Sequence, residues 1–89
     1  MRTVIKDPDE EVIWGFEWSD KMAAGERLSS STWTIPAGIT GANAVYEAQK
    51  TQVEIQGGTS GNQYKVVNEV ATSGGEVFKR SFHVLVRDR

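Results

Sequence analysis

Apolar and polar residues alternate along most of this chain, and a period of two is typical of half-buried β-strands. The alternation is clearest in residues 12–18, where one face is heavily apolar, and it recurs in residues 51–55 and 77–87. No segment repeats its apolar residues at the spacing of an amphipathic helix. The pattern therefore predicts an all-β protein.

Turn-forming residues divide the chain into about seven predicted strands, at roughly the 8–12-residue spacing of a β-sandwich. Asp7-Pro8-Asp9 ends the first strand, because proline has no N–H to give to a ladder. Glycine-rich segments at residues 57–61 and 73–75 end later strands. The predicted strands are residues 3–6, 12–18, 27–35, 44–48, 51–55, 64–72 and 77–87.

Two local irregularities are expected within this pattern. Leu28 and Trp33 are five positions apart, so they cannot share one face of a regular strand. A bulge in residues 29–31 would bring both side chains to the core. Residues 19–25 are predicted to be a loop with room for one helical turn at residues 20–24.

The segment Gly61-Asn62-Gln63-Tyr64-Lys65-Val66 has the form of a tyrosine corner. In such a corner, a tyrosine near the start of a strand bonds back to the backbone just upstream. Val66 stands two residues later, at the core position that is cysteine in antibody domains. The segment thus indicates an immunoglobulin-like (Ig-like) Greek-key β-sandwich. Since the chain has no cysteine, the usual inter-sheet disulfide is absent.

Length and composition indicate one small domain spanning residues 1–89, of which residues 1–10 can form an extended N-terminal arm. The net charge of −2 provides no positive excess for a polyanion, which argues against nucleic acid as a partner. The N-terminus lacks the apolar region of a signal peptide, and no apolar run is long enough to span a bilayer. We therefore expect a complete, soluble product of a reducing cytoplasm, with no membrane partner.

Residues able to carry catalysis or bind metals are sparse. A single histidine, His83, and no cysteine leave only a serine–His83–carboxylate triad, and His83 falls on the outward face of its predicted strand. The usual zinc ligands are missing for the same reason. The acidic segment at residues 7–11 does not match the EF-hand spacing, and residues 57–61 lack the lysine of a phosphate-binding loop. We expect no enzymatic activity, no metal site and no cofactor.

Large apolar residues outside the expected core are the candidate protein contacts. Trp14 and Trp18 share one strand face with a third aromatic residue, which is more than a small core needs. One of the two tryptophans is therefore expected to meet a partner at the end of the sandwich. Ile13, Val67 and Leu85 interrupt the polar faces of their strands. On neighbouring strands these three residues would form one apolar contact patch.

Three motifs stand out as a set. They are Phe16-Glu17-Trp18-Ser19-Asp20, Ser30-Ser31-Thr32-Trp33-Thr34-Ile35-Pro36-Ala37-Gly38-Ile39 and Arg80-Ser81-Phe82-His83-Val84-Leu85-Val86-Arg87. Two further segments go with them, Ile5-Lys6-Asp7-Pro8-Asp9-Glu10 and Tyr64-Lys65-Val66-Val67-Asn68. Together, and over nearly the whole chain from about residue 5 to residue 87, these segments resemble the small fibre-tail adaptor proteins of tailed phages. Members of that family are short Ig-like sandwiches in the virion, and residues 42–49 match their pattern least well.

The resemblance implies a non-catalytic structural subunit of the virion tail, made in the cytoplasm of the host bacterium. Such a subunit is present in several copies and joins tail fibres to the tail or portal region. Its partners are then other tail, portal and fibre subunits, and copies of itself in a ring. The motif residues look like determinants of the fold rather than contact residues; with those of the tyrosine corner, they are Phe16, Trp18, Trp33, Pro36, Tyr64 and Val66.

Edge strands in such an assembly can be completed by an extended segment of a neighbouring copy. Residues 1–6, with Ile5 as their exposed apolar contact, are the candidate segment for this exchange. An alternative function is a glycan- or host-surface-binding Ig-like module, in which an exposed Trp14 or Trp18 stacks on sugar rings. A further alternative is a cytoplasmic Ig-like domain with an unrelated partner.

Overall fold

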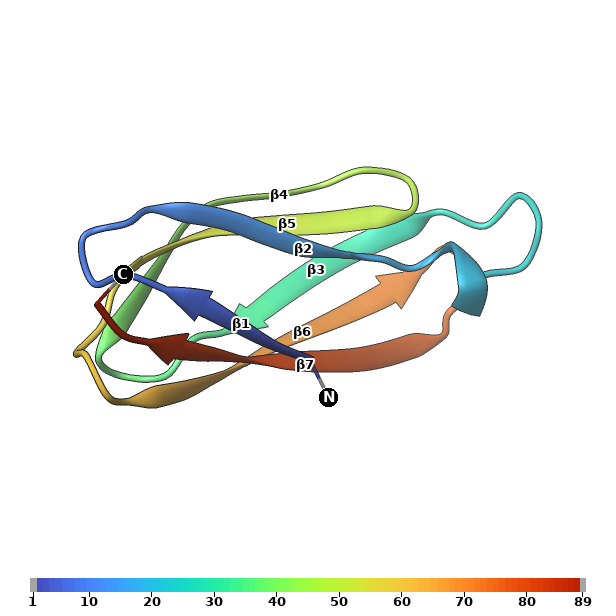
Figure 1. The fold of residues 1–89 in the computed structure, drawn as a ribbon. Helices are drawn as coiled ribbons and strands as arrows, with labels where there is room; N and C mark the ends of the chain where they lie inside the picture. Colours follow the sequence, from blue (N-terminus) through green and yellow to red (C-terminus); the bar gives the residue numbers. More distant parts are fainter. Residues whose placement is uncertain (1, 89) are drawn as a thin grey trace.

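Seven strands form two sheets that pack face to face in the computed structural model, which describes residues 2–88 (Figure 1). One sheet has the strand order β1-β7-β6-β3, and the other has the order β2-β5-β4. β1 runs parallel to β7, and every other pair is antiparallel. The strands are β1 Arg2–Lys6, β2 Val12–Glu17, β3 Leu28–Thr34, β4 Ile39–Tyr46, β5 Lys50–Gly57, β6 Gln63–Thr72 and β7 Val77–Val86.

This architecture confirms the predicted all-β Ig-like sandwich. The expected bulge is present, because the register of β3 against β6 shifts between Leu28 and Ser30. The helical turn expected at residues 20–24 is observed as a 3-10 helix at Ser19–Lys21, so it begins one residue earlier and ends three residues earlier than predicted. In the described residues, no helix is long and apolar enough to cross a membrane.

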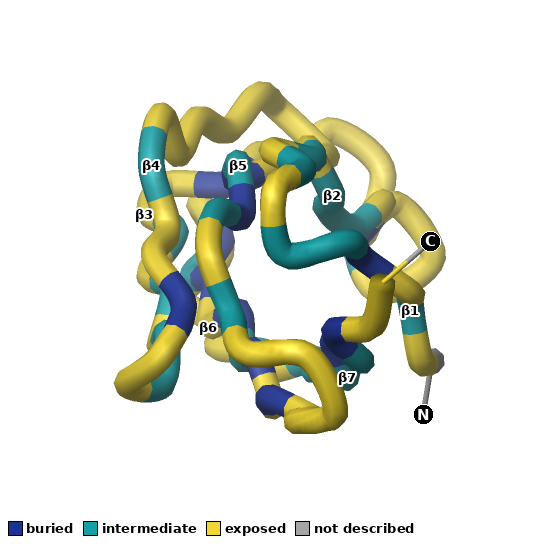
Figure 2. Tube along the Cα trace, turned by 60° about the vertical axis from the view of Figure 1, so that its left-hand side comes forward, coloured by how far each residue is buried: buried dark blue, intermediate teal, exposed yellow. Residues whose placement is uncertain are grey.

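The strand predicted at residues 44–48 was placed too late in the chain. The observed strand, β4, begins at Ile39, and its register against β5 shifts between Ala42 and Val45. Asn43 has a φ of 51° inside this irregularity. The irregularity breaks the alternation that the prediction relied on, and most of β4, an edge strand, is exposed (Figure 2).

The tyrosine corner is confirmed by its hydrogen bond. The Tyr64 hydroxyl accepts a hydrogen bond of 3.1 Å from the backbone N–H of Thr59, and this bond lowers the pKa of the phenol. Gly38 leaves room for the ring: its φ is +103°, and a Cβ there would lie 2.7 Å from Tyr64 Cε1. The corner thereby fixes how the chain crosses from β5 in one sheet to β6 in the other.

Aromatic rings from both sheets fill the centre of the sandwich around Phe82. Its ring centroid lies 5.8 Å from that of Trp14, 5.6 Å from that of Phe16 and 6.4 Å from that of Trp33. Such edge-on and tilted contacts add to the free energy of burying these large side chains. The buried residues of this main cluster are Ile39, Val53, Ile55, Tyr64, Val66, Phe82, Val84 and Val86.

A buried polar network crosses between the two sheets, which the alternation of apolar residues does not reveal. Thr51 of β5 donates to Asn68 Oδ1 of β6 at 2.6 Å, and accepts from Trp18 Nε1 at 3.2 Å. Asn68 Nδ2 in turn donates to Ser31 Oγ and to the carbonyl of Thr32. All three central side chains are therefore partnered, which avoids the cost of an unsatisfied polar group in the core.

A buried lysine holds β1 in the chain's own sheet. Lys6 is fully buried, and its ammonium donates to the carbonyls of Asp7, Pro8 and Gly57, at 2.8, 3.4 and 2.6 Å. These bonds satisfy the three N–H donors of the ammonium. Residues 2–6 thus lie against β7 of the same chain rather than as a detached arm.

One arginine closes the end of the sandwich near the 3-10 helix. Arg80 Nη1 donates to the carbonyl of Glu17 at 2.7 Å, and Nη2 contacts both carboxylate oxygens of Asp20. The guanidinium also lies 4.7 Å from the centre of the Trp18 ring, at cation–π distance. The hydrogen bond from Arg80 is the main reason why the pKa of Asp20 lies below its ordinary value.

Thr51→Val removes one hydroxyl that serves both Trp18 and Asn68. We expect it to lower the free energy of unfolding by about 2 kcal/mol, because two buried polar groups lose their partner. Thr51→Ser, which keeps the hydroxyl and removes only a methyl group, should lose about 1 kcal/mol or less. Urea denaturation followed by tryptophan fluorescence measures both; equal losses would show that the hydroxyl contributes nothing.

Asp20→Asn tests the ion pair between Arg80 and Asp20 through the pH dependence of stability. The folded protein lowers the pKa of Asp20 from 3.8, so the ionised carboxylate stabilises the folded state above that pH. This contribution should disappear as the pH falls from about 4 through the lowered pKa. We expect wild type to be more stable than Asp20→Asn at pH 7 and the difference to vanish in acid. Thermal denaturation from pH 2 to pH 7 measures the difference, and a gap that is the same at every pH would contradict this origin.

Candidate protein-contact surface

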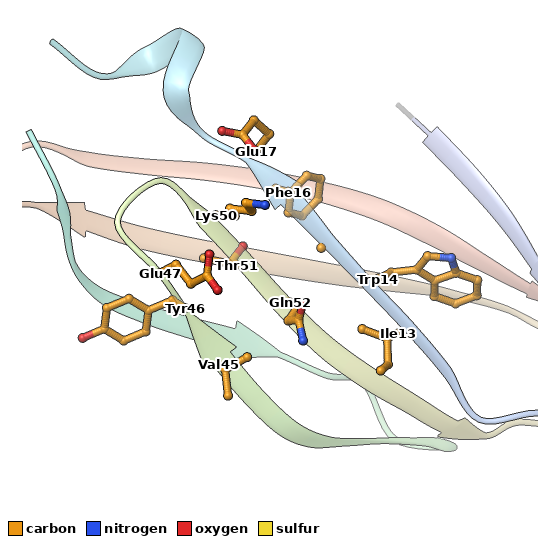
Figure 3. Close-up of a pocket in the computed structure, with 11 residues that line it drawn as sticks. Ile13, Trp14, Phe16, Glu17, Val45, Tyr46, Glu47, Lys50, Thr51 and Gln52 are labelled. Carbon is orange, nitrogen blue, oxygen red and sulfur yellow. The ribbon is translucent and has the colours of Figure 1, made fainter. Parts of the chain in front are cut away.

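A hollow of about 300 Å³ lies on the surface of the β2-β5-β4 sheet (Figure 3). Three large apolar side chains around it are exposed: Ile13 by 59%, Val45 by 51% and Tyr46 by 46%. Only two other large apolar residues are exposed in the described part of the chain, Ile5 and Val77. We call the hollow with its lining the groove. Exposed apolar side chains gathered in this way are typical of a protein-contact site.

The groove results from how β2, β5 and β4 are aligned. Gly15 of β2, Gln52 of β5 and Val45 of β4 are register partners in one row across the sheet. Gly15 has no side chain to fill this row, and a Cβ there would lie far too close to the carbonyl of Thr51. Ile13 and Val45 therefore stand on either side of Gln52 with open space between them (Figure 3).

Tyr46 forms one rim of the groove and also links the two sheets at that side. Its hydroxyl donates to the backbone carbonyl of Ser29 in β3, at 3.0 Å. The bond fixes an aromatic ring that remains nearly half exposed. A rigid, partly exposed tyrosine suits a contact surface, because little conformational entropy is lost when a partner covers it.

The charged residues around the groove give it an acidic rim. Glu17, Glu47 and Lys50 line it, and Glu54 is the register partner of Ile13. The outer side of the opposite sheet carries Lys65 as the register partner of His83. Lys65 is thus opposite in sign to the glutamates beside the groove.

The expectation of a single patch formed by Ile13, Val67 and Leu85 is wrong. Ile13 lies in β2, whereas Val67 and Leu85 lie in β6 and β7 of the other sheet. Val67 pairs with Ser81 and Leu85 pairs with Gln63, so the two side chains are also separated along their sheet. Leu85 instead has Ile5 of β1 as its register partner. We call this pair the Ile5–Leu85 patch.

The expectation that Trp18 serves as a surface contact is also wrong. Trp18 is fully buried, between Phe16 at 5.8 Å, Phe78 at 6.5 Å and the guanidinium of Arg80. Trp18 stands at the end of an alternating segment, and the sequence around it does not show that Arg80, from a distant strand, covers its ring. Trp14 is half-buried against Phe82. Stacking of a sugar ring on Trp18 is therefore not possible in this fold.

The structure places the remaining residues from the sequence motifs inside or beside the core. Val66 is fully buried and Tyr64 nearly so, while Phe16 and Trp33 pack against the main cluster. Pro36 is half-buried in the connection from β3 to β4. Val45 and Tyr46, by contrast, were missed as candidate contact residues, because they fall in the segment whose strand was misplaced.

Groups of side chains that could bind a metal are absent from residues 2–88: no three or more His, Cys, Asp or Glu residues gather there. The acidic segment is a turn, in which the Asp7 N–H donates to Glu10 Oε1 at 2.7 Å and the Asp9 N–H donates to Asp7 Oδ1 at 2.9 Å. His83 is half-buried on β7, with Thr3 and Lys65 as its register partners.

Comparison with known proteins identifies the family. A solved structure that resembles the chain is the PKD domain from KIAA 1837 protein, determined in solution, with a TM-score of 0.59 and 16% sequence identity. The match covers 99% of this chain and 80% of that one, and it supports the Ig-like fold alone. No curated protein matches the chain. The family model of the podophage GP4 fiber-tail adaptor protein gp77 matches residues 6–85, which confirms the resemblance found in the sequence, and the chain therefore belongs to this family of phage fibre-tail adaptors.

Proposed function

We propose that the protein is a structural subunit of a tailed-phage virion, which joins tail fibres to the tail or portal region through protein–protein contacts. The match to the fibre-tail adaptor family over residues 6–85 is the observation that carries this proposal. In this proposal the subunit is made in the cytoplasm of the host bacterium and acts without catalysis or a cofactor. Its partners are other tail, portal and fibre proteins, together with copies of itself.

The proposal includes a ring in which neighbouring copies touch through two different surfaces. A head-to-tail ring requires such a pair of unlike surfaces on each subunit. The groove lies on the β2-β5-β4 sheet and the Ile5–Leu85 patch lies on the other sheet, so one copy can present both at once. We propose that the patch of one copy packs on the groove of the next.

Shape and charge support this pairing. Ile5 is 43% exposed and forms an apolar projection, while the groove is a hollow with apolar walls. Lys65, near the patch, is opposite in sign to Glu17 and Glu47 at the rim of the groove. Complementary charges of this kind favour one mutual orientation of two surfaces.

Ile13→Lys is expected to keep the fold and to remove the protein from phage particles. Ile13 is 59% exposed, so a lysine there meets no steric obstacle, but it places a charge in the groove. Val77→Lys is the matched control, because Val77 is also 59% exposed and does not line the groove.

The measurement is mass spectrometry of particles sedimented from a lysate of the producing host, with each variant supplied as a tagged chain. Wild type and Val77→Lys should be found in the particles in several copies, and Ile13→Lys should be reduced at least about tenfold, which is the effect of about 1.4 kcal/mol at one interface. Incorporation of Ile13→Lys at the level of wild type would eliminate the groove as a contact. Absence of the wild-type chain from particles would eliminate the adaptor function itself.

Introduced cysteines test the ring, since the chain has no cysteine of its own. Val45→Cys with Leu85→Cys places one thiol in the groove and one in the patch of every copy. Oxidation of assembled protein should then give a reducible ladder of trimers and larger species. Val77→Cys with Leu85→Cys is the control pair and should give no ladder, because Val77 lies in neither surface. A Val45–Leu85 pair that gives no species beyond the dimer would contradict the head-to-tail contact.

A further inference from the structure

The free edge of β2 is a feature that the proposed ring leaves unused. β2 has β5 as its only neighbour in the sheet, within the part of the chain that the structure describes. Its six register pairs with β5, from Val12 to Glu17, contain no shift. β3 and β4, two of the other edge strands, each contain a register shift, which weakens an edge as a template for pairing.

The direction of the free backbone groups follows from two hydrogen bonds. The Trp18 N–H donates to the carbonyl of Gln49 at 2.7 Å, and these two residues continue the β2–β5 register one step beyond the pair of Glu17 and Lys50. Since bonded and non-bonded pairs alternate in an antiparallel ladder, even-numbered residues of β2 point their N–H and C=O groups at β5. Odd-numbered residues point theirs outward, and the bond from Arg80 to the carbonyl of Glu17 agrees with this. Ile13 and Gly15 thus offer their N–H and C=O groups at the free edge.

The side of the sandwich beside this edge is apolar and only partly covered. A small hollow there is lined by residues from β1, β2 and β7: Val4, Trp14, Gly15, Phe16 and Phe82. Trp14 and Phe16 are half-buried, although both pack against the main core. An added strand next to β2 would lie about 4.8 Å away and would place alternate side chains over this hollow.

Acidic residues flank both ends of the edge. Glu11 precedes β2 and Glu17 ends it, and both side chains are exposed, whereas β2 itself contains no basic residue. A second copy of β2 pairing antiparallel over its full length would bring Glu17 close to Glu11 of the other copy, and like charges in that position are destabilising. The charges therefore favour a partner with basic residues at its ends.

From these observations we infer that β2 binds an extended segment of another tail protein as an added strand. The segment has about five or six residues, is apolar at alternate positions and carries lysine or arginine near its ends. Backbone hydrogen bonds at Ile13 and Gly15 provide the affinity, and the apolar surface of Trp14 and Phe16 at the small hollow favours apolar side chains. That the partner is a tail protein rests on the proposed function; the chemistry of the segment rests on the structure alone.

The N-terminal segment of a second copy is a poorer occupant. Residues 2–6 already form five register pairs with β7 of their own chain. The buried ammonium of Lys6 would have to leave three carbonyls before this segment could move. Strand exchange between copies would show itself as self-association of the free chain, in place of peptide binding.

The test uses the purified chain and two peptide probes. One probe is a capped seven-residue peptide of alternating valine and threonine with lysine at both ends, and the other has glutamate at both ends. Nuclear magnetic resonance measures the amide hydrogen exchange of the ¹⁵N-labelled chain and its affinity for each probe. The lysine-ended peptide should slow exchange at Ile13 and Gly15 and bind about fivefold more tightly, which is the effect of two exposed ion pairs.

A charge-reversed variant sharpens the test. Glu11→Lys with Glu17→Lys should reverse the preference, so that the glutamate-ended peptide binds more tightly. Unchanged exchange at Ile13 and Gly15, protection at another edge, or equal binding of the two peptides by wild type would overturn the inference. Because no particle is involved, a negative result here leaves the adaptor function standing, and absence of the chain from particles leaves the peptide result standing.

Discussion

The hydrogen bond between Thr51 and Asn68 is the interaction on which the rest of the sandwich depends. It joins β5 in one sheet to β6 in the other, at 2.6 Å and out of contact with water. In antibody domains a disulfide joins the sheets, and this chain has no cysteine. The bond is directional, and Trp18 and Ser31 partner the remaining polar atoms of the pair. It therefore fixes how the two sheets are aligned. Apolar packing around Phe82 is not directional and restricts this alignment less.

Most of the fold could be predicted from the sequence, because it follows from local chemistry. A period of two marks a strand with one buried face. From this alternation, β2, β5, β6 and β7 and their inward-facing residues could be predicted. The tyrosine corner depends on Tyr64 and the backbone five residues upstream, so it too is visible in a short segment. The bulge near Ser29 followed from the spacing of two core residues. Each of these features is decided by neighbours along the chain.

The candidate contact surface could not be predicted in this way, because it depends on which strands become neighbours. Ile13 and Leu85 look alike in the sequence, as single apolar residues on polar faces, yet they lie on different sheets. Val45 and Tyr46 were missed, because the irregularity around Asn43 removes the alternation that marks a strand. Trp18 was misassigned because Arg80, which covers it, is 62 positions away in the sequence.

The two long sides of the sandwich are closed differently, and this asymmetry underlies the two kinds of contact that we propose. On one side, the Tyr46 hydroxyl bonds to β3 and links the two sheets. On the other, β1 and β2 are separated by an apolar hollow, and β2 keeps unused backbone groups. A surface made of side chains binds by shape and charge, whereas a strand edge binds almost any extended segment of suitable pattern. The proposed ring would use the first property, because copies of one chain must fit each other closely, and the proposed strand addition would use the second.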